Sequence, residues 1–415
     1  MNYLGIDVSK SSHRIAILDG EGESLTKSFS VESSQEGFNS LLEKIKSLSL
    51  SPDILLCGLE ATGNLWENIY SLLTAAGFKV IVLNPYQTNK YHQLLAKKAK
   101  TDDIDALVIA GLLRSKEHIN SYVPDDLIQS LREHVKLRDK LLKDLKDYKR
   151  QTYSLLELVF PEYLKAVKNP FGIASSTILK HFPTATHFAQ AKLKDLLNIV
   201  RHIQGNTYPE DFLSELIELA KKSIYSGKAS KSRGLNVKIL ITQIEQTQNS
   251  IAELDAAIEQ LLKPEDPESS LPDTPLSIPG VGKKTLAVYL AMVGDTLRFP
   301  STKQLIGFIG LYPEIKQSGE SQNSPHLTHR GCPILKHALY MAAVASLIHN
   351  PYLKSIYDKK ISQGKKPKQA LIVVARKIAC MIHSMIKNNT EFEPERFFVS
   401  KTKYKNDSLC YLTAL

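Results

Sequence analysis

Cysteine is scarce in this sequence. Only four cysteines occur among 415 residues, at positions 57, 332, 380 and 410, and no two of them are close together in the chain. A structural zinc site needs closely spaced ligand pairs, and a disulfide framework is typical of small, cysteine-rich secreted domains. The spacing therefore argues against both kinds of site and favours a reducing cytoplasm.

Long apolar runs are missing as well. No stretch of about 18 apolar residues is found, so we expect no membrane-spanning helix and no membrane partner. The first ten residues, MNYLGIDVSK, carry charge where a secretory signal needs an apolar run. Both absences point to a cytoplasmic protein.

The positive charge that is present is unevenly distributed. Of the net charge of +10, residues 1–115 contribute −2, whereas residues 271–390 hold 16 basic and 5 acidic residues, a net charge of +11. A local excess of this size favours a nucleic-acid partner, because binding releases the counterions of the phosphates. A role in solubility alone is the alternative. The division suggests an N-terminal domain for chemistry and a C-terminal one that grips nucleic acid.

The length predicts two or three domains, the first spanning residues 1–115. Its order of elements, β-β-β-α-β-α-β-α, is that of a ribonuclease-H-like fold, although many α/β folds share parts of it. The expected strands are 3–6, 14–18, 28–31, 54–59 and 79–83. The expected helices are 35–47, capped by Ser34, then 65–76, 86–98 and 102–113.

The remainder is predicted to be helical. Residues 116–270 contain two long, charged, amphipathic helices at 126–160 and 237–262, which could pair as an antiparallel coiled coil and mediate oligomerisation. A plain helical spacer is the alternative. Prolines at 264, 267, 272 and 275 then mark a boundary. Residues 271–390 form a compact, basic helical domain, followed by a tail at 391–415.

Four acidic residues in the first domain occupy positions that suit a metal site. Asp7 and Glu60 each end an apolar strand, and Asp102 and Asp105 are spaced to share one face of a helix. Asp103 points about 100° away from Asp102 and is left out. Hard cations need such oxygen ligands, and a pair of Mg²⁺ ions could orient a nucleophile and stabilise the oxygen leaving a phosphodiester. Mn²⁺ is an alternative metal. Each acid alone could be a turn residue or a helix cap.

A glycine-rich turn opens the C-terminal domain. The segment PGVGKKT contains Gly280, Gly282, Lys283 and Lys284, and it resembles the hairpin of helix-hairpin-helix DNA binders, whose glycines let backbone N–H groups approach a phosphate. It is not a P-loop, because the GxxxxGK[ST] spacing is absent. An ordinary turn between helices is the alternative.

Five segments together resemble one known family. They are GIDVSK at 5–10, GLEATGNLW at 58–66, LNPYQ at 83–87, KTDDIDA at 100–106 and FIGLYPEIKQSG at 308–319. This combination resembles the DEDD transposases, the bacterial and archaeal insertion-sequence family that includes the pilin-gene invertase and is known for bridge-RNA-guided recombination. The resemblance covers residues 1–115 and 276–388, and the middle of the chain matches only as a helical spacer.

The resemblance implies a role for each part of the chain. The first domain is expected to be similar to the RuvC resolvase fold, with Asp7, Glu60, Asp102 and Asp105 as its metal ligands. Ser318 matches the serine that forms a covalent bond to a 5′ phosphate of cleaved DNA, whereas Ser321 and Ser324 do not. The implied partners are donor and target DNA, a structured bridge RNA, and further copies of the chain in a dimer or tetramer.

Basic residues near the serine depart from the family pattern. Where family members carry a Ser-Lys-x-Gly type run and then Leu-Arg, this chain has LTHRGC followed by Leu335 and Lys336. We therefore expect the basic residues of this chain to contact phosphates, and we assign them no further role. Those singled out are Lys316, Arg330, Lys336, Lys365, Lys366 and Arg376.

The predicted function is site-specific DNA strand exchange that moves an insertion sequence. One alternative is a metal-dependent nuclease of the Holliday-junction type that hydrolyses DNA with water, in which Ser318 would be dispensable. A second alternative is a nucleic-acid-binding protein without catalysis, which leaves the four-acid pattern unexplained.

Overall fold

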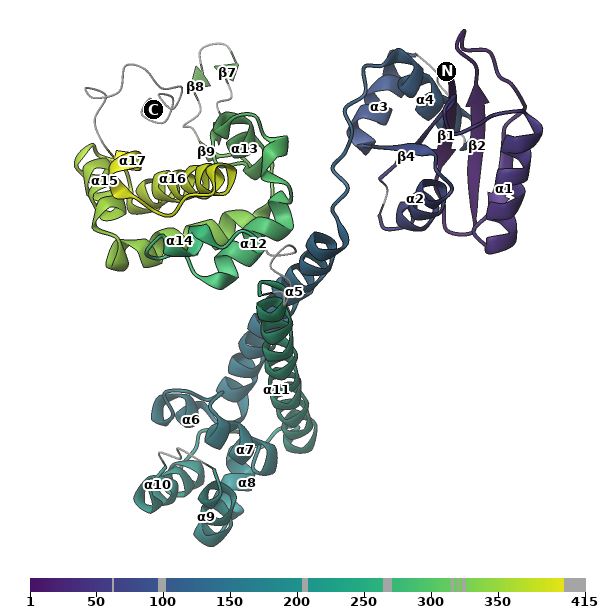
Figure 1. Cartoon of the computed structure of the whole chain (residues 1–415). Helices are drawn as coiled ribbons and strands as arrows, with labels where there is room; N and C mark the ends of the chain where they lie inside the picture. The colour runs from purple at the N-terminus through teal and green to yellow at the C-terminus, as the bar shows by residue number, and fades with distance from the viewer. Residues whose placement is uncertain are drawn as a thin grey trace. The chain divides into compact units, whose positions relative to one another are not determined.

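The structure is a computed structural model, and it divides into two units, Met1–Val123 and Pro124–Leu415, which are described separately (Figure 1). The first unit extends past residue 115 because Val123 packs against its core and the Ser121 amide bonds to the Val82 carbonyl. The described residues are 1–61, 63–95, 102–203, 208–263, 271–314, 317–318, 321–322 and 326–398.

A mixed five-stranded sheet forms the centre of the first unit, as predicted. The strands are β1 (Asn2–Asp7), β2 (Ser12–Leu18), β3 (Phe29–Glu32), β4 (Leu55–Glu60) and β5 (Lys79–Leu83). Their order across the sheet is β3-β2-β1-β4-β5, with β1, β4 and β5 parallel and β2 antiparallel to both of its neighbours. The carboxyl ends of the three parallel strands therefore lie at one edge of the sheet.

Helices cover both faces of this sheet. They are α1 (Gln35–Ser47), α2 (Trp66–Ala75), α3 (Pro85–Leu94) and α4 (Asp102–Ser115). One core joins Leu4 and Ile6 of β1 to α1 and α2, and a second core joins Tyr3 of the same strand to α4. Alternate residues of β1 thus serve opposite faces, as a buried strand requires. The predicted cap is confirmed, because the Ser34 side chain accepts a hydrogen bond from the Gly37 amide.

Helix α4 lies unusually close to the central strand. A Cβ atom at Gly5 would be 2.1 Å from the Ala106 carbonyl oxygen and 2.6 Å from the Ala110 nitrogen. Only glycine fits between β1 and a helix at this distance, because both neighbouring atoms belong to the backbone of the helix. The contact fixes the height of α4 above the sheet.

Gly5→Ala is therefore expected to destabilise the first unit by about 3 kcal/mol or more, since α4 must move away from β1 to make room for the methyl group. The only tryptophan, Trp66, packs against the core of this unit, so its fluorescence during urea unfolding reports this unit. Gly20→Ala is the matched control, because its Cβ would meet only the Met1 carbonyl oxygen at 3.7 Å. Equal midpoints for the two variants would contradict the close approach.

Two long helices form the backbone of the second unit. Helix α5 (Asp126–Val159) packs along α11 (Ser230–Leu261). They are antiparallel, because Ile258 shares a core with the start of α5 while Ile241 shares another with its end. The predicted pairing is thus observed, and coiled-coil packing stays a prediction. The helices between them are α6 (Pro161–Ala166), α7 (Ile173–His181), α8 (Ala185–Gln190), α9 (Leu193–Arg201) and α10 (Glu210–Lys221).

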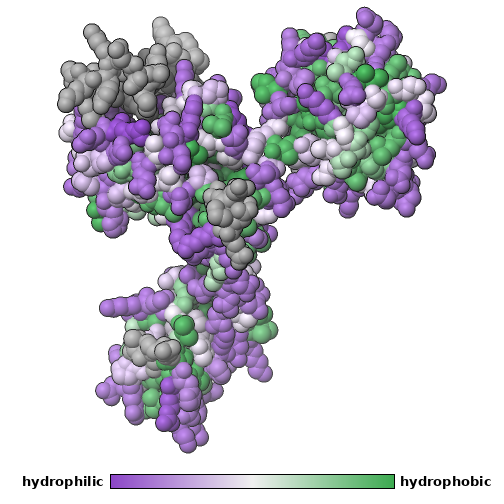
Figure 2. All heavy atoms as spheres, in the orientation of Figure 1, coloured by the Kyte–Doolittle hydropathy of each residue, from purple (hydrophilic) through white to green (hydrophobic). Residues whose placement is uncertain are grey.

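The five shorter helices close over a core that they share with the end of α5 and the start of α11. Phe160, Tyr163 and Phe188 are fully buried there, with ring centroids 5.2–5.6 Å apart. Hydrophilic residues cover most of the visible surface of this helical region, as expected for charged amphipathic helices (Figure 2).

The C-terminal part of the second unit is built around helix α16, which has eleven buried residues. The start of α5 belongs to this core through Ile128, Leu131 and Val135. The helix α16 spans Pro367–Asn388, and the elements around it are η2 (Thr274–Ser277), α12 (Lys283–Val293), η3 (Thr296–Arg298), α13 (Thr302–Ile309), α14 (Pro333–His349), α15 (Pro351–Ser362) and α17 (Pro394–Phe398).

Four short strands interrupt these helices, so the prediction of a purely helical domain was incomplete. Each strand has only two residues, too few to produce an alternating pattern in the sequence. They are β6 (Pro313–Glu314), β7 (Gln317–Ser318), β8 (Ser321–Gln322) and β9 (His326–Leu327), paired β6 with β9 and β7 with β8.

Among the described residues, α16 alone is long and apolar enough to match a membrane-spanning helix by composition. Its sequence therefore comes closer to such a segment than the search for apolar runs indicated. Of the 18-residue apolar stretch in this helix, 61% is buried inside the protein, which is typical of the central helix of a folded domain.

Candidate active site

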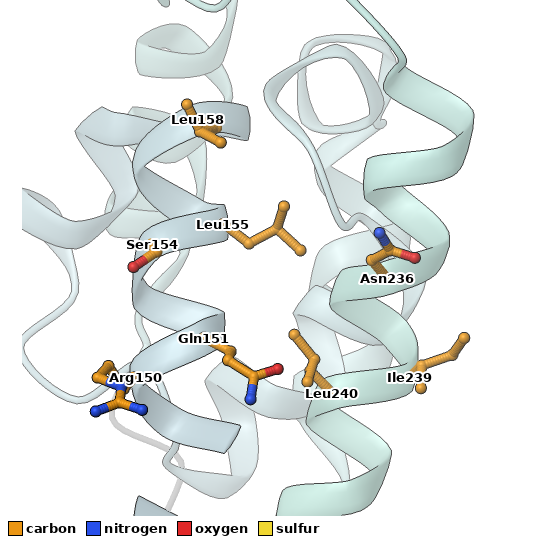
Figure 3. A pocket seen from close by; sticks show the side chains of 8 residues that line it. All are labelled: Arg150, Gln151, Ser154, Leu155, Leu158, Asn236, Ile239 and Leu240. Carbon is orange, nitrogen blue, oxygen red and sulfur yellow. The ribbon is translucent and has the colours of Figure 1, made fainter. Parts of the chain in front are cut away.

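A hollow on the described surface of the second unit does not have the chemistry of an active site. It lies between α5 and α11, where Gln151 and Leu155 of one helix and Leu240 of the other point into the space between them (Figure 3). Arg150 is the one charged residue in its lining. A catalytic centre needs several polar groups that converge on one point, so the site has to lie elsewhere.

Two of the predicted acids lie side by side at the carboxyl edge of the sheet. Asp7 is the last residue of β1 and Glu60 the last of β4. These strands are parallel neighbours in the register Ile6 to Leu59, so the next residues along, Asp7 and Glu60, are adjacent across the ladder. Both residues are half-buried.

The first turn of α4 reaches the same edge. Asp103 in that turn forms an ion pair with Arg14, and Arg14 is the residue of β2 directly opposite Asp7. Asp105 follows in the same turn, is half-buried, and directly precedes Ala106, which rests on Gly5. The fold thus brings Asp7, Glu60 and the start of α4 together. Asp102 is the first residue of α4, and its side chain lies outside the described atoms.

Asp103 pairs with Arg14 of the neighbouring strand β2. The hydrogen bond from Arg14 is the main cause that holds the pKa of the Asp103 carboxyl below its ordinary value. Its side chain is 49% exposed and faces β2. The ion pair between Asp103 and Arg14 ties α4 to the sheet. This pairing is consistent with leaving Asp103 out of the predicted metal ligands.

Thr88 is a site residue that the sequence analysis missed. It lies in the first turn of α3 and is 5% exposed, and its hydroxyl donates a hydrogen bond to Oε2 of Glu60. The same hydroxyl lies 3.0 Å from the Pro85 carbonyl oxygen. Its position directly after the LNPYQ segment was the available signal. A hydroxyl that donates a hydrogen bond to one oxygen of a carboxylate fixes the direction in which the other oxygen points.

The donor set has the chemistry of a site for a hard cation. The acids offer carboxylate oxygens only, which suits Mg²⁺ or Mn²⁺ rather than a softer metal. Across the side chains that the structure describes, no three His, Cys, Asp or Glu residues are close enough to hold one ion.

The glycine-rich turn of the C-terminal domain is occupied by contacts within the protein. Lys284 forms an ion pair with Asp255 of α11 at 2.7 Å, and Lys283 forms one with Glu259. Gly280 has a φ of +99°, and a Cβ there would be 2.4 Å from the Ser346 hydroxyl oxygen. The turn thus joins α12 to α11 and α14, while Gly282 is open to solvent. A phosphate contact of this turn stays a prediction.

Lys336 likewise binds the protein itself. Its ammonium group donates to the carbonyl oxygens of Thr328 at 3.1 Å and Arg330 at 2.9 Å. The Thr328 hydroxyl donates to Glu314 at 3.2 Å, across the β6–β9 pair. These bonds fix both ends of the segment that carries Ser318.

The serine itself is placed only through its backbone. Ser318 lies in β7, opposite Ser321 of β8, and its side chain and Lys316 lie outside the described atoms. Among the other predicted contacts, Arg330, Lys365 and Lys366 are exposed and Arg376 is half-buried. No described contact links the serine to an activating base.

Comparison with known proteins bears on the whole chain. Residues 4–161 match the DEDD transposase family, and residues 275–358 match the family described as "Transposase IS116/IS110/IS902 family". The 43.6 kDa protein of insertion element IS110 from Streptomyces coelicolor is 24% identical over 397 residues, covering 94% of this chain and 95% of that protein.

Two further likenesses differ in extent. The pilin gene-inverting protein of Moraxella bovis is 24% identical, covering 94% of this chain and 97% of that protein. A structure of T. thermophilus RuvC in complex with a Holliday junction substrate matches 29% of this chain and 100% of its own, with 15% identity and a TM-score of 0.22, too low to carry an argument. Because the two family matches together span more than half of the chain, it belongs to the IS110 family of DEDD DNA transposases.

Proposed function

We propose that the protein is a site-specific recombinase that moves an insertion sequence by cutting and rejoining DNA through a serine–phosphate intermediate. The observation that carries this proposal is the meeting of Asp7, Glu60 and the first turn of α4 at one edge of the sheet. The β3-β2-β1-β4-β5 strand order supports a ribonuclease-H-like fold of the RuvC type for this domain. The net charge of +11 in residues 271–390 supports a grip on DNA.

The chemistry is a reversible transfer of a phosphoryl group. The Ser318 hydroxyl oxygen attacks the phosphorus of a DNA phosphodiester and loses its proton. The bond from phosphorus to the 3′ oxygen breaks, and that oxygen takes up a proton, so the 5′ phosphate remains on the serine. Attack by a 3′ hydroxyl of another strand reverses the step, which joins the new strands and restores the serine.

The acidic residues would hold the metal that this step requires. Asp7, Glu60, Asp102 and Asp105 are the proposed ligands. Mg²⁺, or Mn²⁺ in its place, would polarise the phosphate and stabilise the departing oxygen when bound. Thr88 keeps the Glu60 carboxylate turned toward α3, and Arg14 holds the first turn of α4 against the sheet. The acids and the serine act on one phosphate, contributed by a single chain or by two subunits.

The remaining parts of the proposal concern partners. A structured bridge RNA that pairs with donor and target DNA would supply the sequence specificity, and a dimer or tetramer would bring two DNA ends together. Both follow from the family resemblance. The exposed Arg330, Lys365 and Lys366 would contact phosphates.

The test is to trap the protein on branched DNA in the presence of Mg²⁺ and to map the linked residue by mass spectrometry. We expect a covalent adduct in which a 5′ phosphate is esterified to Ser318. Cleavage that leaves no adduct would favour hydrolysis by water, and an adduct on another residue would overturn the assignment of the serine.

The contact between Thr88 and Glu60 leads to a separate prediction. Thr88→Val removes the hydroxyl, so the Glu60 carboxylate loses its fixed direction, and we expect strand cleavage to fall about 10- to 100-fold. The Mg²⁺ concentration for half-maximal cleavage should also rise. Thr88→Ser keeps the hydroxyl and should stay within a fewfold of the original protein. If Thr88→Val cleaves normally with an unchanged Mg²⁺ requirement, Thr88 does not position a ligand.

A further inference from the structure

The first turn of α3 directs three consecutive side chains to three different places. The Gln87 amide exchanges two hydrogen bonds with the backbone of Ile119, at 2.8 and 2.9 Å. Thr88 is buried and donates to Glu60. Tyr86 projects into solvent and is 69% exposed. Because its two neighbours are anchored, the position of Tyr86 relative to Glu60 is fixed.

The exposed face of α3 continues in a way that suits a nucleic-acid strand. Lys90 follows one turn after Tyr86, and its ammonium nitrogen lies 5.8 Å from the centre of the Tyr86 ring. Leu94 follows one further turn along the same face and is 75% exposed. Lys90 is exposed, and its ammonium group also donates to Oε1 of Gln93 in the same helix at 3.4 Å. A flat ring beside an exposed cation can stack on a base while the cation contacts the adjoining phosphate.

Burial explains neither Tyr86 nor Lys90, since the hydrogen bonds that hold α3 in place come from other side chains, those of Asn84, Gln87, Thr88 and Tyr91. The Asn84 side chain caps the helix by accepting from the Tyr86 amide at 2.8 Å. The Tyr86 ring takes no part in that bond. An exposed aromatic ring on a well-anchored helix offers a flat face on which a base can stack.

We propose that Tyr86 is a stacking platform for an unpaired base of the DNA strand that is cut, with Lys90 on a flanking phosphate. The inference rests on the proposed function and adds a binding subsite to it. Tyr86 precedes Thr88 by two residues, so its ring lies on another side of α3 from Glu60. A base on the ring therefore belongs to a nucleotide that flanks the one whose phosphate lies at the acids. Residues 1–115 have a net charge of −2, which does not attract DNA. The positive charge of Lys90 therefore offers a DNA strand a local attraction at this position.

The test measures binding without cleavage. The full chain is titrated, with EDTA present, into branched DNA that carries one unpaired 2-aminopurine, and both affinity and fluorescence quenching are recorded. Tyr86→Ala should weaken binding about tenfold and remove much of the quenching, because stacking contributes roughly that factor per base. Binding of fully paired duplex should not change. Tyr86→Phe keeps the ring and should retain both signals.

Two further variants separate stacking from other effects. Lys90→Gln should lower the slope of affinity against salt by about one contact. Leu94→Ala is the matched control, as an exposed apolar residue on the same face, and should bind branched DNA normally. An unpaired RNA strand of the same sequence forms the second arm. If Tyr86→Ala weakens RNA binding and spares DNA, the ring serves the RNA and the assignment to DNA is wrong.

The outcome is independent of whether the serine reacts. Tyr86→Ala that binds branched DNA as well as the original protein would overturn the stacking platform even if the Ser318 adduct forms. If Tyr86→Ala loses binding and quenching while the original protein forms no adduct at Ser318, the stacking role of Tyr86 is supported and only the serine mechanism is overturned.

Discussion

Asp105→Asn is expected to reduce DNA strand cleavage by about a thousandfold or more while the protein remains folded. The substitution keeps the shape of the side chain and removes the negative charge that would bind the cation. Electrostatic stabilisation by a bound metal contributes several kcal/mol to such a transition state, which corresponds to this loss of rate. The measurement is single-turnover cleavage of branched DNA, with Trp66 fluorescence as the check on folding.

Asp103→Asn is the matched control, two residues away on the same helix. Its side chain is 49% exposed and is paired with Arg14, and exposed ion pairs stabilise proteins by about 0–1 kcal/mol. The side-chain oxygen of Asn can still accept the hydrogen bond from Arg14, so α4 stays tied to the sheet and cleavage by Asp103→Asn should stay within several-fold of the original rate. If the two variants were to exchange these results, the set of ligands would have to include Asp103 and exclude Asp105.

The acidic edge was predictable because it depends on strand ends. An apolar strand that ends in an acid is visible in the sequence at Asp7 and at Glu60, and parallel strands bring such ends together. The spacing of Asp102 and Asp105 is equally visible. The two-sided burial of β1, which alternates Leu4 and Ile6 with Tyr3, also left its pattern in the sequence.

The contacts that refine this edge were not predictable. Thr88 touches Glu60 from 28 residues further along the chain. Its place directly after the LNPYQ segment marks it as a candidate, but nothing in the sequence shows that Glu60 is its partner. Gly5 could be recognised as a glycine before the acid, but its contact with Ala106 depends on how closely α4 approaches. Both follow from packing in three dimensions, which local periodicity does not encode.

The basic residues have contacts that charge and spacing did not reveal. Lys283, Lys284 and Lys336 each bind a group within the protein, and the phosphate contacts expected of them stay a prediction. Asp255 accepts from both Lys284 and Arg138. Burial opposes its ionisation, but these hydrogen bonds prevail and hold the pKa of its carboxyl below the ordinary value. A count of charges cannot distinguish a lysine that binds DNA from one that joins two helices.

Ser318→Ala is expected to abolish the covalent adduct and to lower strand exchange by about four orders of magnitude or more, because the nucleophile itself is removed. DNA binding should remain, since the basic surface is unchanged. Lys336 holds the C-terminal end of the segment through Thr328, and Thr328 in turn binds Glu314 at the N-terminal end. These bonds do not involve the serine, so the variant should keep this part of the fold. Gel-shift affinity and adduct yield, measured on the same branched DNA, separate binding from chemistry.

Ser321→Ala is the matched control because Ser321 lies directly opposite Ser318 in the β7–β8 pair. It makes the same chemical change in the same short hairpin, so any general disturbance of the segment would affect both variants alike. We expect Ser321→Ala to form the adduct at a rate within a fewfold of the original. Adduct formation by Ser318→Ala with its loss in Ser321→Ala would move the nucleophile across the hairpin. Cleavage by Ser318→Ala without any adduct would identify water as the attacking group and leave the acids as a nuclease site.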